Sequence, residues 1–334
     1  MNVLPKRMRA VIGAELGPPE HYELLETDVP EPGPGEVLVR VRVSGMGYVD
    51  GLVSRGLYQV KPTVPYCPGL EYAGTVAAVG ERVTDVAIGD TVAVSAFGGG
   101  LAEYAVAPSA AVARLPATFD PGVAAGFIVN YTTAWHGLID RAGLQPGETV
   151  LVLGAAGGTG IAAVQVARLA GARVIAGAST ETKRAFALAH GAHEGLDYSR
   201  EDWRSTLKSL TDGRGVDVVY DPVGGDLLEP AFRSLAWRGR HLVIGFAGGR
   251  IPALPVNLAL LKGSALVGVD YRQFGSVFER EAAARIHLQL FDAVARGDLK
   301  PPRGTSFPLD RFRDAMALAA SRDGLGKTTV EIPD

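Results

Sequence analysis

The hydrophobic and polar positions in the first third of the chain follow the pattern of short strands. Residues 36–43, with the sequence EVLVRVRV, alternate apolar and charged side chains, which is typical of a strand with one buried face. Residues 9–14, 73–79 and 91–95 are further short apolar runs, separated by turns rich in Gly, Asp and Pro. Several short strands at this spacing predict an irregular antiparallel barrel.

From residue 121 onward, helical and strand-like segments alternate. Strands are predicted at 149–153, 173–176, 216–220 and 241–244, and helices at 121–142, 160–170, 180–190 and 227–234. This alternation is typical of βαβ units, in which helices cover both faces of a parallel sheet. The end of the chain is predicted to be helical at 278–296 and 309–320, before a strand at 328–332 that returns to the first domain. The sequence therefore predicts an α/β protein with two domains.

Composition narrows the class of protein. The chain has 334 residues, of which 47% are hydrophobic and 21% charged, and this excludes a disordered chain and a coiled coil. Its 33 basic and 36 acidic residues give a net charge of −3 without any Lys- and Arg-rich segment, so nucleic acid and membrane partners are not expected. No secretory signal is visible, and Gly and polar residues interrupt the longest uncharged stretches. We therefore expect a cytoplasmic, soluble protein.

The strongest local motif is a turn of small residues between a predicted strand and a predicted helix. Residues 154–160, GAAGGTG, follow the apolar run 149–153 and match the pattern A-x-G-x-x-G. Small side chains let the backbone turn sharply and approach a pyrophosphate, and the N–H groups at the start of the helix then face the anion. The turn therefore predicts dinucleotide binding. The alternative is a glycine-rich turn that serves only close strand–helix packing.

The end of the second predicted strand indicates which dinucleotide is bound. A site selective for NAD usually places Asp or Glu here to bind the ribose 2′-hydroxyl, but residues 177–179 are Gly-Ala-Ser. Ser179 is followed by Lys183, Arg184 and Tyr198, and a cation with nearby hydroxyl groups suits a 2′-phosphate. These residues favour NADPH. A solvated helix face is the alternative explanation for the two cations.

Further short motifs extend over nearly the whole chain. They are RGLY at 55–58, PGLEYAG at 68–74, YTTA at 131–134, LQPGE at 144–148, DPVGG at 221–225 and VIGF at 243–246. Together with the glycine turn, they resemble the medium-chain dehydrogenase/reductase superfamily, and more narrowly its zinc-independent NADPH:quinone oxidoreductase (zeta-crystallin-like) branch. The resemblance implies a GroES-like catalytic domain of residues 1–122 and 268–334, and a Rossmann NADP-binding domain of residues 123–267. It also implies a cofactor site in the interdomain cleft and a homodimer, with residues 265–269 as a sheet-edge contact.

The resemblance also implies roles for individual residues. By matching position, the expected cofactor contacts are Thr133, Gly157, Gly158, Thr159, Gly160, Ser179, Lys183, Tyr198, Phe246 and, near the nicotinamide, Lys327. Tyr58, with Tyr48 as the second choice, is predicted to be the catalytic hydrogen-bond donor to substrate, because a phenol can donate at neutral pH. The alternatives are that Tyr58 only packs on its loop and that solvent supplies the proton.

No metal site is predicted. Zinc alcohol dehydrogenases of this superfamily carry a catalytic Cys three residues before an Asp, and a His in a Gly-His-Glu step. The matching positions are Gly47, before Asp50, and Leu70, before Glu71, and neither Gly nor Leu can bind a metal. The quinone oxidoreductase branch often has Asn at the position of Gly47, so this chain is predicted to have a wider substrate pocket, which Tyr48 could partly fill.

Three functions are compatible with these features. Without a metal a simple ketone is hard to polarise, whereas a quinone or an enone is already activated. The leading hypothesis is therefore hydride transfer from NADPH to a quinone or an α,β-unsaturated carbonyl compound. A 2-enoyl thioester reductase is the second hypothesis, with Arg272 and Arg280 as candidate contacts to an anionic carrier. The third is a catalytically weak NADPH-binding or structural protein, because the branch includes crystallins.

Overall fold

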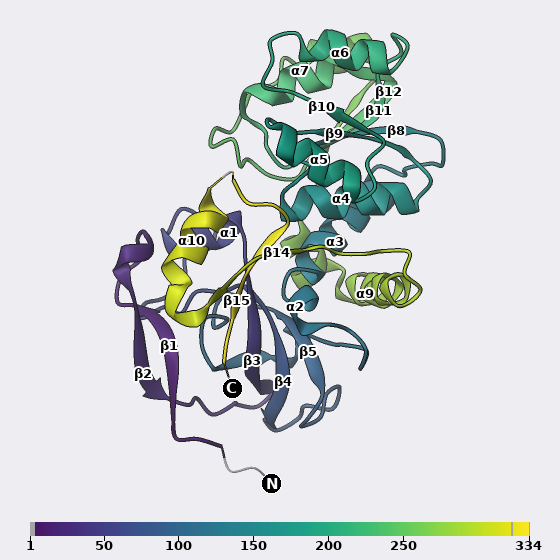
Figure 1. The fold of residues 1–334 in the computed structure, drawn as a ribbon. Helices are drawn as coiled ribbons and strands as arrows, with labels where there is room; N and C mark the ends of the chain where they lie inside the picture. Colours follow the sequence, from purple (N-terminus) through teal and green to yellow (C-terminus); the bar gives the residue numbers. More distant parts are fainter. Residues whose placement is uncertain (1–3, 322, 334) are drawn as a thin grey trace. The chain divides into compact units, whose positions relative to one another are not determined.

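The computed structural model (Figure 1) describes residues 4–321 and 323–333. The predicted domain ranges also include residues 1–3, 322 and 334, which lie outside the described residues. Contacts divide the chain into a first unit, Met1–Val129 with Pro302–Asp334, and a second unit, Asn130–Pro301. This unit begins and ends later in the chain than the predicted Rossmann domain, 123–267. Its end lies later because β13 (Ala265–Gly268) pairs with the sheet of this unit and the helix α9 (Arg280–Ala295) follows within it.

The first unit is built on a sheet of seven strands. Its order is β14-β15-β3-β4-β5-β7, and β6 also pairs with β3. These strands are β3 (Glu36–Met46), β4 (Glu71–Val79), β5 (Thr91–Ser95), β6 (Tyr104–Pro108), β7 (Val112–Arg114), β14 (Arg303–Pro308) and β15 (Lys327–Glu331). As predicted, the pairing is antiparallel, with the exception of β14, which runs parallel to β15.

Smaller elements complete the first unit. The strands β1 (Arg7–Gly13) and β2 (Tyr22–Asp28) form a separate antiparallel hairpin. The helices are α1 (Tyr48–Ser54), α2 (Pro121–Ala124) and α10 (Phe312–Ala320), with short 3₁₀ turns at Pro19–His21, Ser109–Ala111 and Leu309–Arg311. Helix α1 packs beside α10 (Figure 1). Side chains from both helices join the buried core of the sheet.

The second unit contains a six-stranded, fully parallel sheet, which confirms the predicted βαβ organisation. Its strand order is β10-β9-β8-β11-β12-β13. The other strands are β8 (Thr149–Leu153), β9 (Arg173–Gly177), β10 (Glu194–Leu196), β11 (Val216–Asp221) and β12 (Leu235–Val243). The helices are α3 (Ile128–Trp135), α4 (Gly158–Leu169), α5 (Glu181–Ala189), α6 (Trp203–Leu210), α7 (Leu228–Arg233), α8 (Asn257–Lys262) and α9. Helix α3 starts at the end of the first unit. The second unit also has π-helical segments at His136–Arg141 and Gln273–Phe278 and a 3₁₀ turn at Gly225–Leu227.

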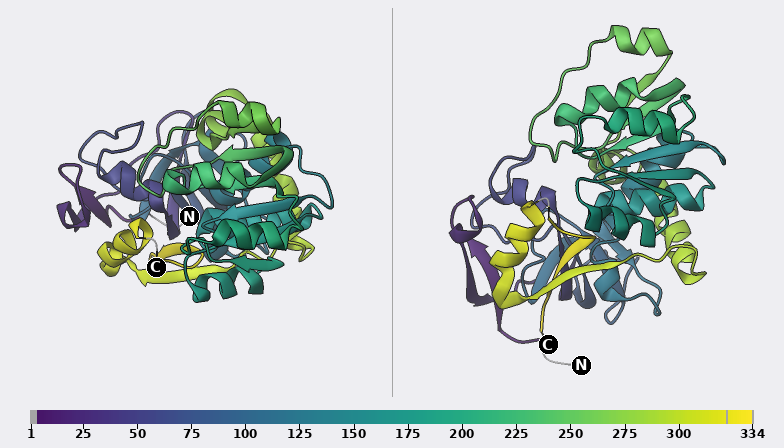
Figure 2. Two further views of the ribbon diagram at one scale, coloured as in Figure 1. Left: turned by 90° about the horizontal axis from the view of Figure 1, so that it is seen from above. Right: turned by 45° about the horizontal axis from the view of Figure 1, so that its top comes forward.

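Helices cover both faces of this sheet. Helices α6 and α7 lie on one face, and α4 and α5 lie on the other (Figure 1 and Figure 2). All of β8 is buried, and its odd-numbered residues Leu151 and Leu153 belong to the same apolar cluster as Trp203 of α6 and Phe232 of α7. A strand buried on both faces needs a continuous apolar run, and this explains why β8 could be predicted to the residue.

The predicted helix 121–142 is interrupted in the structure. Asp120 caps α2 by accepting a hydrogen bond from the Gly122 N–H at 2.8 Å, and the helix ends at Ala124. A turn at residues 125–127 separates it from α3, which continues into the π-helical segment. The turn contains Gly126, where a Cβ atom would lie 2.5 Å from Cγ of Lys327, so a larger residue there would meet this lysine.

Candidate functional site

The predicted phosphate-binding turn joins β8 to α4 in the second unit. Gly154 has φ of +59°, which favours glycine, and α4 begins directly after Gly157. A Cβ atom at Gly160 would lie 2.1 Å from the carbonyl oxygen of Gly154, so only glycine fits this close approach. The first N–H groups of a helix have no partner within the helix. The turn therefore presents backbone donors and a helix N-terminus where an anion can bind.

Four predicted cofactor contacts lie in or beside this turn. Gly157, Gly158 and Thr159 are half-buried, and Gly160 is buried. The Thr159 hydroxyl donates a hydrogen bond to Oδ1 of Asn130 at 2.9 Å, which fixes the first turn of α4 against α3. Thr133, on the same helix as Asn130, is buried with 7% of its surface exposed.

Three further predicted contacts gather at the carboxyl ends of β9 and β10. Ser179 comes two residues after β9, and Lys183 lies in the first turn of α5, which Thr180 caps by accepting a hydrogen bond from the Lys183 N–H at 3.3 Å. Tyr198 follows β10, and a Cβ atom at Gly177 would lie 3.2 Å from its ring. The structure therefore brings these residues to adjacent strand ends, where open parallel sheets usually bind ligands.

Arg184 follows Lys183 in α5. Its guanidinium group forms an ion pair with Asp197 at 3.0 Å and donates a hydrogen bond to the carbonyl oxygen of Ala178 at 3.1 Å. Arg184 thus connects α5 to the loop after β10.

The loops after β11 and β12 hold Phe246. The carboxylate of Asp221, which is 1% exposed, accepts hydrogen bonds from the N–H groups of Val223 at 2.9 Å and Gly224 at 2.8 Å. Its other oxygen lies 3.0 Å from Nε2 of the fully buried His241. A Cβ atom at Gly224 would lie 2.8 Å from the ring of Phe246, so glycine lets the aromatic ring pack against this loop.

The two candidate catalytic tyrosines lie in the first unit. Tyr48 is the first residue of α1 and is half-buried. Tyr58 comes four residues after the end of this helix, packs against the apolar core of the unit, and has its ring 6.5 Å from that of Phe97. The packing contacts that the sequence left as the alternative for Tyr58 are therefore present.

A buried group of charges also lies in the first unit, and no local pattern in the sequence predicts it. Lys327 donates a hydrogen bond from Nζ to Oε2 of Glu71 at 2.9 Å, with side-chain exposures of 15% and 2%. Asp50, which is 5% exposed, is the second carboxylate that interacts electrostatically with Lys327. We call Lys327, Glu71 and Asp50 the lysine cluster. The sequence named Lys327 as a cofactor contact and the other two only as parts of motifs.

Strand register assembles the lysine cluster. In the antiparallel pair of β15 and β3, Thr328 lies opposite Met46, so the preceding residue, Lys327, comes beside Gly47. In the pair of β3 and β4, Gly45 lies opposite Glu71. Asp50 is held by hydrogen bonds that its carboxylate accepts from the N–H groups of Gly47 at 2.8 Å and Leu70 at 2.9 Å.

The surroundings of the lysine cluster shift the pKa of each member. Burial raises the pKa of Glu71 and of Asp50 above the ordinary range of carboxyl groups, although the charge of Lys327 opposes the shift. Burial lowers the pKa of Lys327, but the two carboxylates outweigh this effect and raise the pKa overall. The negative charges of Glu71 and Asp50 thus favour the protonated, ammonium form of Lys327.

Gly47 and Leu70, at the two positions that match the zinc ligands of the superfamily, have no side chain that could bind a metal. Their backbone N–H groups donate hydrogen bonds to the carboxylate of Asp50. Within residues 4–321 and 323–333, no group of three or more His, Cys, Asp or Glu side chains could hold a metal ion. Among the same residues, no helix is both long and apolar enough to cross a membrane.

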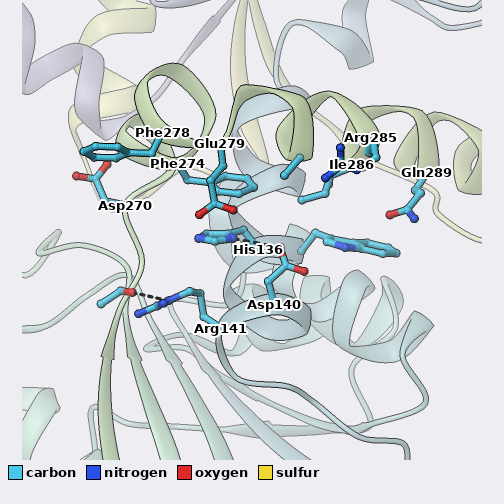
Figure 3. A pocket seen from close by; sticks show the side chains of 13 residues that line it. His136, Asp140, Arg141, Asp270, Phe274, Phe278, Glu279, Arg285, Ile286 and Gln289 are labelled. Atoms are coloured by element: carbon cyan, nitrogen blue, oxygen red, sulfur yellow. Dashed lines mark hydrogen bonds and ion pairs between the residues drawn. The ribbon is translucent and has the colours of Figure 1, made fainter.

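A separate pocket of about 620 Å³ lies in the second unit, between the π-helical segments and α9 (Figure 3). The ring of His136 stacks on that of Phe274 at 3.8 Å, and its Nδ1 lies 3.1 Å from the Asp140 carboxylate. Arg141 donates a hydrogen bond to the carbonyl oxygen of Gly268 at 3.3 Å, drawn as a dashed line in Figure 3. Among the described residues, the side chains that line this pocket include none of the predicted cofactor or substrate contacts.

Comparison with known proteins agrees with this geometry. Residues 33–117 match the family described as "Alcohol dehydrogenase GroES-like domain", and residues 158–286 match the family described as "Zinc-binding dehydrogenase". These two matches confirm the predicted fold class. The domain bounds and the roles of single residues stay predictions.

Curated relatives cover the chain almost from end to end. It is 37% identical over 328 residues to a quinone oxidoreductase-like protein 2 homolog of Nematostella vectensis, covering 97% of this chain and 89% of that protein. It is 34% identical over 313 residues to the quinone oxidoreductase of Homo sapiens, covering 93% of each. Among solved structures, the Escherichia coli quinone oxidoreductase complexed with NADPH superposes with a TM-score of 0.89 at 27% identity, covering 97% of this chain and 99% of that one.

Proposed function

The chain belongs to the medium-chain dehydrogenase/reductase superfamily, in its quinone oxidoreductase-like branch, and we propose that it is an NADPH-dependent reductase of quinones or α,β-unsaturated carbonyl compounds that works without a metal. That the protein is an oxidoreductase follows from the family. The choice of cofactor, acceptor and residue roles is the proposal.

The observation that carries the proposal is the turn between β8 and α4. Its residues fit a dinucleotide, because Gly160 lets the start of the helix pack against Gly154 and leaves the first N–H groups of α4 directed at a pyrophosphate. Thr133, Gly157, Gly158 and Thr159 contribute the surrounding contacts. When bound, the reduced nicotinamide supplies the hydride.

Preference for NADPH is assigned to the ends of β9 and β10. Lys183 supplies a positive charge to the 2′-phosphate, and Ser179 and Tyr198 supply hydroxyl groups. No acidic side chain stands at residues 177–179 to bind a free 2′-hydroxyl. Phe246 is assigned to contacts farther along the cofactor. The NADPH-bound relative from E. coli supports this choice.

Quinones and enones are the proposed acceptors because Gly47 and Leu70 occupy the positions of the superfamily's zinc ligands. Without a Lewis acid, an acceptor must be activated by its own structure. Tyr58, or Tyr48 as the second choice, is assigned to donate a hydrogen bond or a proton to the acceptor, with solvent as the competing proton source.

A homodimer is part of the proposal. Strand β13 is an edge of the parallel sheet, with Leu266 exposed, and the preceding helix α8 exposes Leu260 and Leu261. An edge strand with unpaired backbone groups and exposed apolar side chains is a template for pairing with a second copy of the chain. Light scattering of the purified protein is expected to give twice the chain mass, 34.9 kDa.

The test is NADPH oxidation against four acceptors: a quinone, an enone, a 2-enoyl thioester and a simple ketone, with NADH as the competing cofactor. We expect turnover with the quinone or the enone, a preference for NADPH, and no loss of activity after treatment with a strong chelator. Turnover confined to the thioester would establish the second hypothesis instead. Tight NADPH binding without turnover of any acceptor would favour the binding-protein hypothesis, and activity lost with chelation would contradict the metal-free proposal.

A further inference from the structure

The aliphatic part of the Lys327 side chain packs directly against two glycines, Gly126 and Gly45. A Cβ atom at Gly126 would lie 2.5 Å from Cγ of Lys327, and one at Gly45 would lie 2.9 Å from its Cε. A side chain at Gly126 would displace the lysine, and one at Gly45 would meet the carbonyl oxygen of Ala125, at 1.8 Å, as well as the lysine. The stem is therefore confined, and it delivers the ammonium group to one place beside Gly47, where a Cβ atom would be 3.4 Å from Nζ.

The ammonium group of Lys327 is held in one orientation, and not all of its hydrogen-bond donors are used by the described residues. In the part of the chain that the structure describes, its hydrogen-bond acceptor is Glu71, whereas an ammonium group has three donors. The carboxylates have further partners, because Oε1 of Glu71 accepts from the N–H of Val129 at 3.0 Å and Asp50 accepts from two backbone N–H groups. Because residue 47 has no side chain, the space beside Nζ stays open to a ligand atom, and 15% of the Lys327 side chain is exposed.

We propose that Lys327 is the electrophile of the reaction, and that its ammonium group donates a hydrogen bond to the carbonyl oxygen of the acceptor in the space left by Gly47. This inference rests on the proposed function and adds a catalytic residue to it. Glu71 and Asp50 are positioning residues that hold the ammonium group in place and charged. A fixed cation at this point takes the electrostatic role that a metal has in zinc enzymes of the superfamily.

The chemistry balances with an enone as the acceptor. The hydride brings two electrons and forms a C–H bond at the β-carbon, and the electron pair of the C=C bond moves toward the carbonyl group to give an enolate. Lys327 stabilises the negative charge on the enolate oxygen. A proton from solvent or Tyr58 then adds at the α-carbon, so the substrate gains two hydrogens in total. With a quinone, one hydride and one proton together give the hydroquinone, and the negative charge develops on a carbonyl oxygen before the proton adds.

The first measurement compares the wild type with the double variant Lys327→Met/Glu71→Gln. The double variant removes both charges of the pair, whereas Lys327→Met alone would leave Glu71 buried and unpaired. We expect kcat/KM to fall by about 100- to 1000-fold, the usual loss when a donor to a developing oxyanion is removed. The loss is expected to be larger for enones than for strongly oxidising quinones. NADPH affinity, measured by its fluorescence, separates this role from the predicted contact of Lys327 with the cofactor, because an electrophile that binds only the acceptor leaves the affinity unchanged, whereas a cofactor contact does not. Lys208→Met on the exposed face of α6 is the matched control.

The second measurement does not depend on turnover. 4-Nitrophenol imitates an enolate when ionised, and its phenolate absorbs visible light. Binding next to the ammonium group is expected to lower the apparent pKa of the phenol in the wild type and in Lys208→Met, but not in the double variant. Gly47→Val provides a second test that keeps the lysine cluster intact. Gly47 has φ of −136°, which any residue adopts, and a branched side chain there would cover Nζ.

These readouts separate the two proposals. One outcome would overturn the role of Lys327 and leave the proposed function intact. In that outcome the wild type reduces quinones, and both the double variant and Gly47→Val keep normal turnover and a normal shift of the phenol pKa. Absence of quinone and enone turnover in the wild type would overturn the proposed function, and a phenol shift that still depends on Lys327 would support the oxyanion site. A wild type that does not shift the phenol would contradict the site itself.

Discussion

The glycine turn of the second unit and the lysine cluster of the first unit are two ways of preparing a place for negative charge. The turn is one continuous segment, residues 154–160, and it offers backbone dipoles at the start of α4. The lysine cluster joins Asp50, Glu71 and Lys327, and it uses a buried full charge whose position depends on the register of three strands. The first is suited to a phosphate that is always charged, and the second to an oxygen that becomes charged during the reaction.

Because of this difference, we expect different kinds of substitution to disrupt the two regions. The turn depends on the absence of side chains, so added atoms disrupt it whatever their polarity. The lysine cluster depends on charge balance, so a neutral variant of the same shape disrupts it while leaving the packing intact.

Gly160→Ala should cause the largest loss of NADPH binding. The added Cβ atom would lie 2.1 Å from the carbonyl oxygen of Gly154, so α4 must move away from the turn. We expect the dissociation constant of NADPH to rise by at least about 100-fold, corresponding to about 2.7 kcal/mol. Gly268→Ala in β13 is the matched control, because it lies outside the turn and a Cβ atom there would meet nothing within 4 Å. Equal losses in a fluorescence titration of both variants would contradict a steric role for Gly160.

How far the sequence predicts each region follows from the same contrast. Strand β8 and the turn were predicted because an apolar run and a glycine pattern are local signals. Strand β14 was missed because its residues, RGTSFP, are mostly exposed and do not alternate between apolar and polar. The helix 121–142 was drawn too long because the turn at residues 125–127 interrupts a stretch whose sequence looks helical throughout. The pairing of Lys327 with Glu71 could not be predicted, since it requires the register of β15, β3 and β4.

Lys183→Ala should cause a smaller and selective loss. A hydrogen bond to a charged group contributes about 1.5–3 kcal/mol, so NADPH binding should weaken by about 10- to 150-fold, while NADH binding should change little. Arg184→Ala is the control, because Arg184 forms an ion pair with Asp197 and is expected to affect stability more than cofactor preference. Equal weakening of NADPH and NADH by Lys183→Ala would remove the 2′-phosphate assignment.

The smallest expected effects are changes in the pH dependence of stability, which should have opposite signs in the two units. In the second unit, burial acts to raise the pKa of Glu148, but hydrogen bonds from Arg240 at 2.7 and 2.8 Å and its charge outweigh this effect, so the pKa is lowered overall. A lowered pKa adds stability above the unfolded value of about 4.3 that is lost as the pH falls through the folded value. In the first unit, burial raises the pKa of Glu71, so its contribution to stability is lost as the pH rises through the folded value.

Glu148→Gln and Glu71→Gln should therefore differ in the slope of their stability relative to wild type. Between about pH 4 and about pH 8, the advantage of wild type over Glu148→Gln should grow by about 1 kcal/mol or less, as expected for a partly exposed ion pair. The advantage of wild type over Glu71→Gln should shrink over the same range. All three tryptophans, Trp135, Trp203 and Trp237, lie in the second unit, so their fluorescence follows the unfolding of that unit, and calorimetry follows both. If the stability difference from wild type changed with pH in the same direction for both variants, the pKa of Glu71 would be lowered in the folded protein. Lys327 would then outweigh the effect of burial on Glu71, and the lysine cluster would resemble an ordinary ion pair.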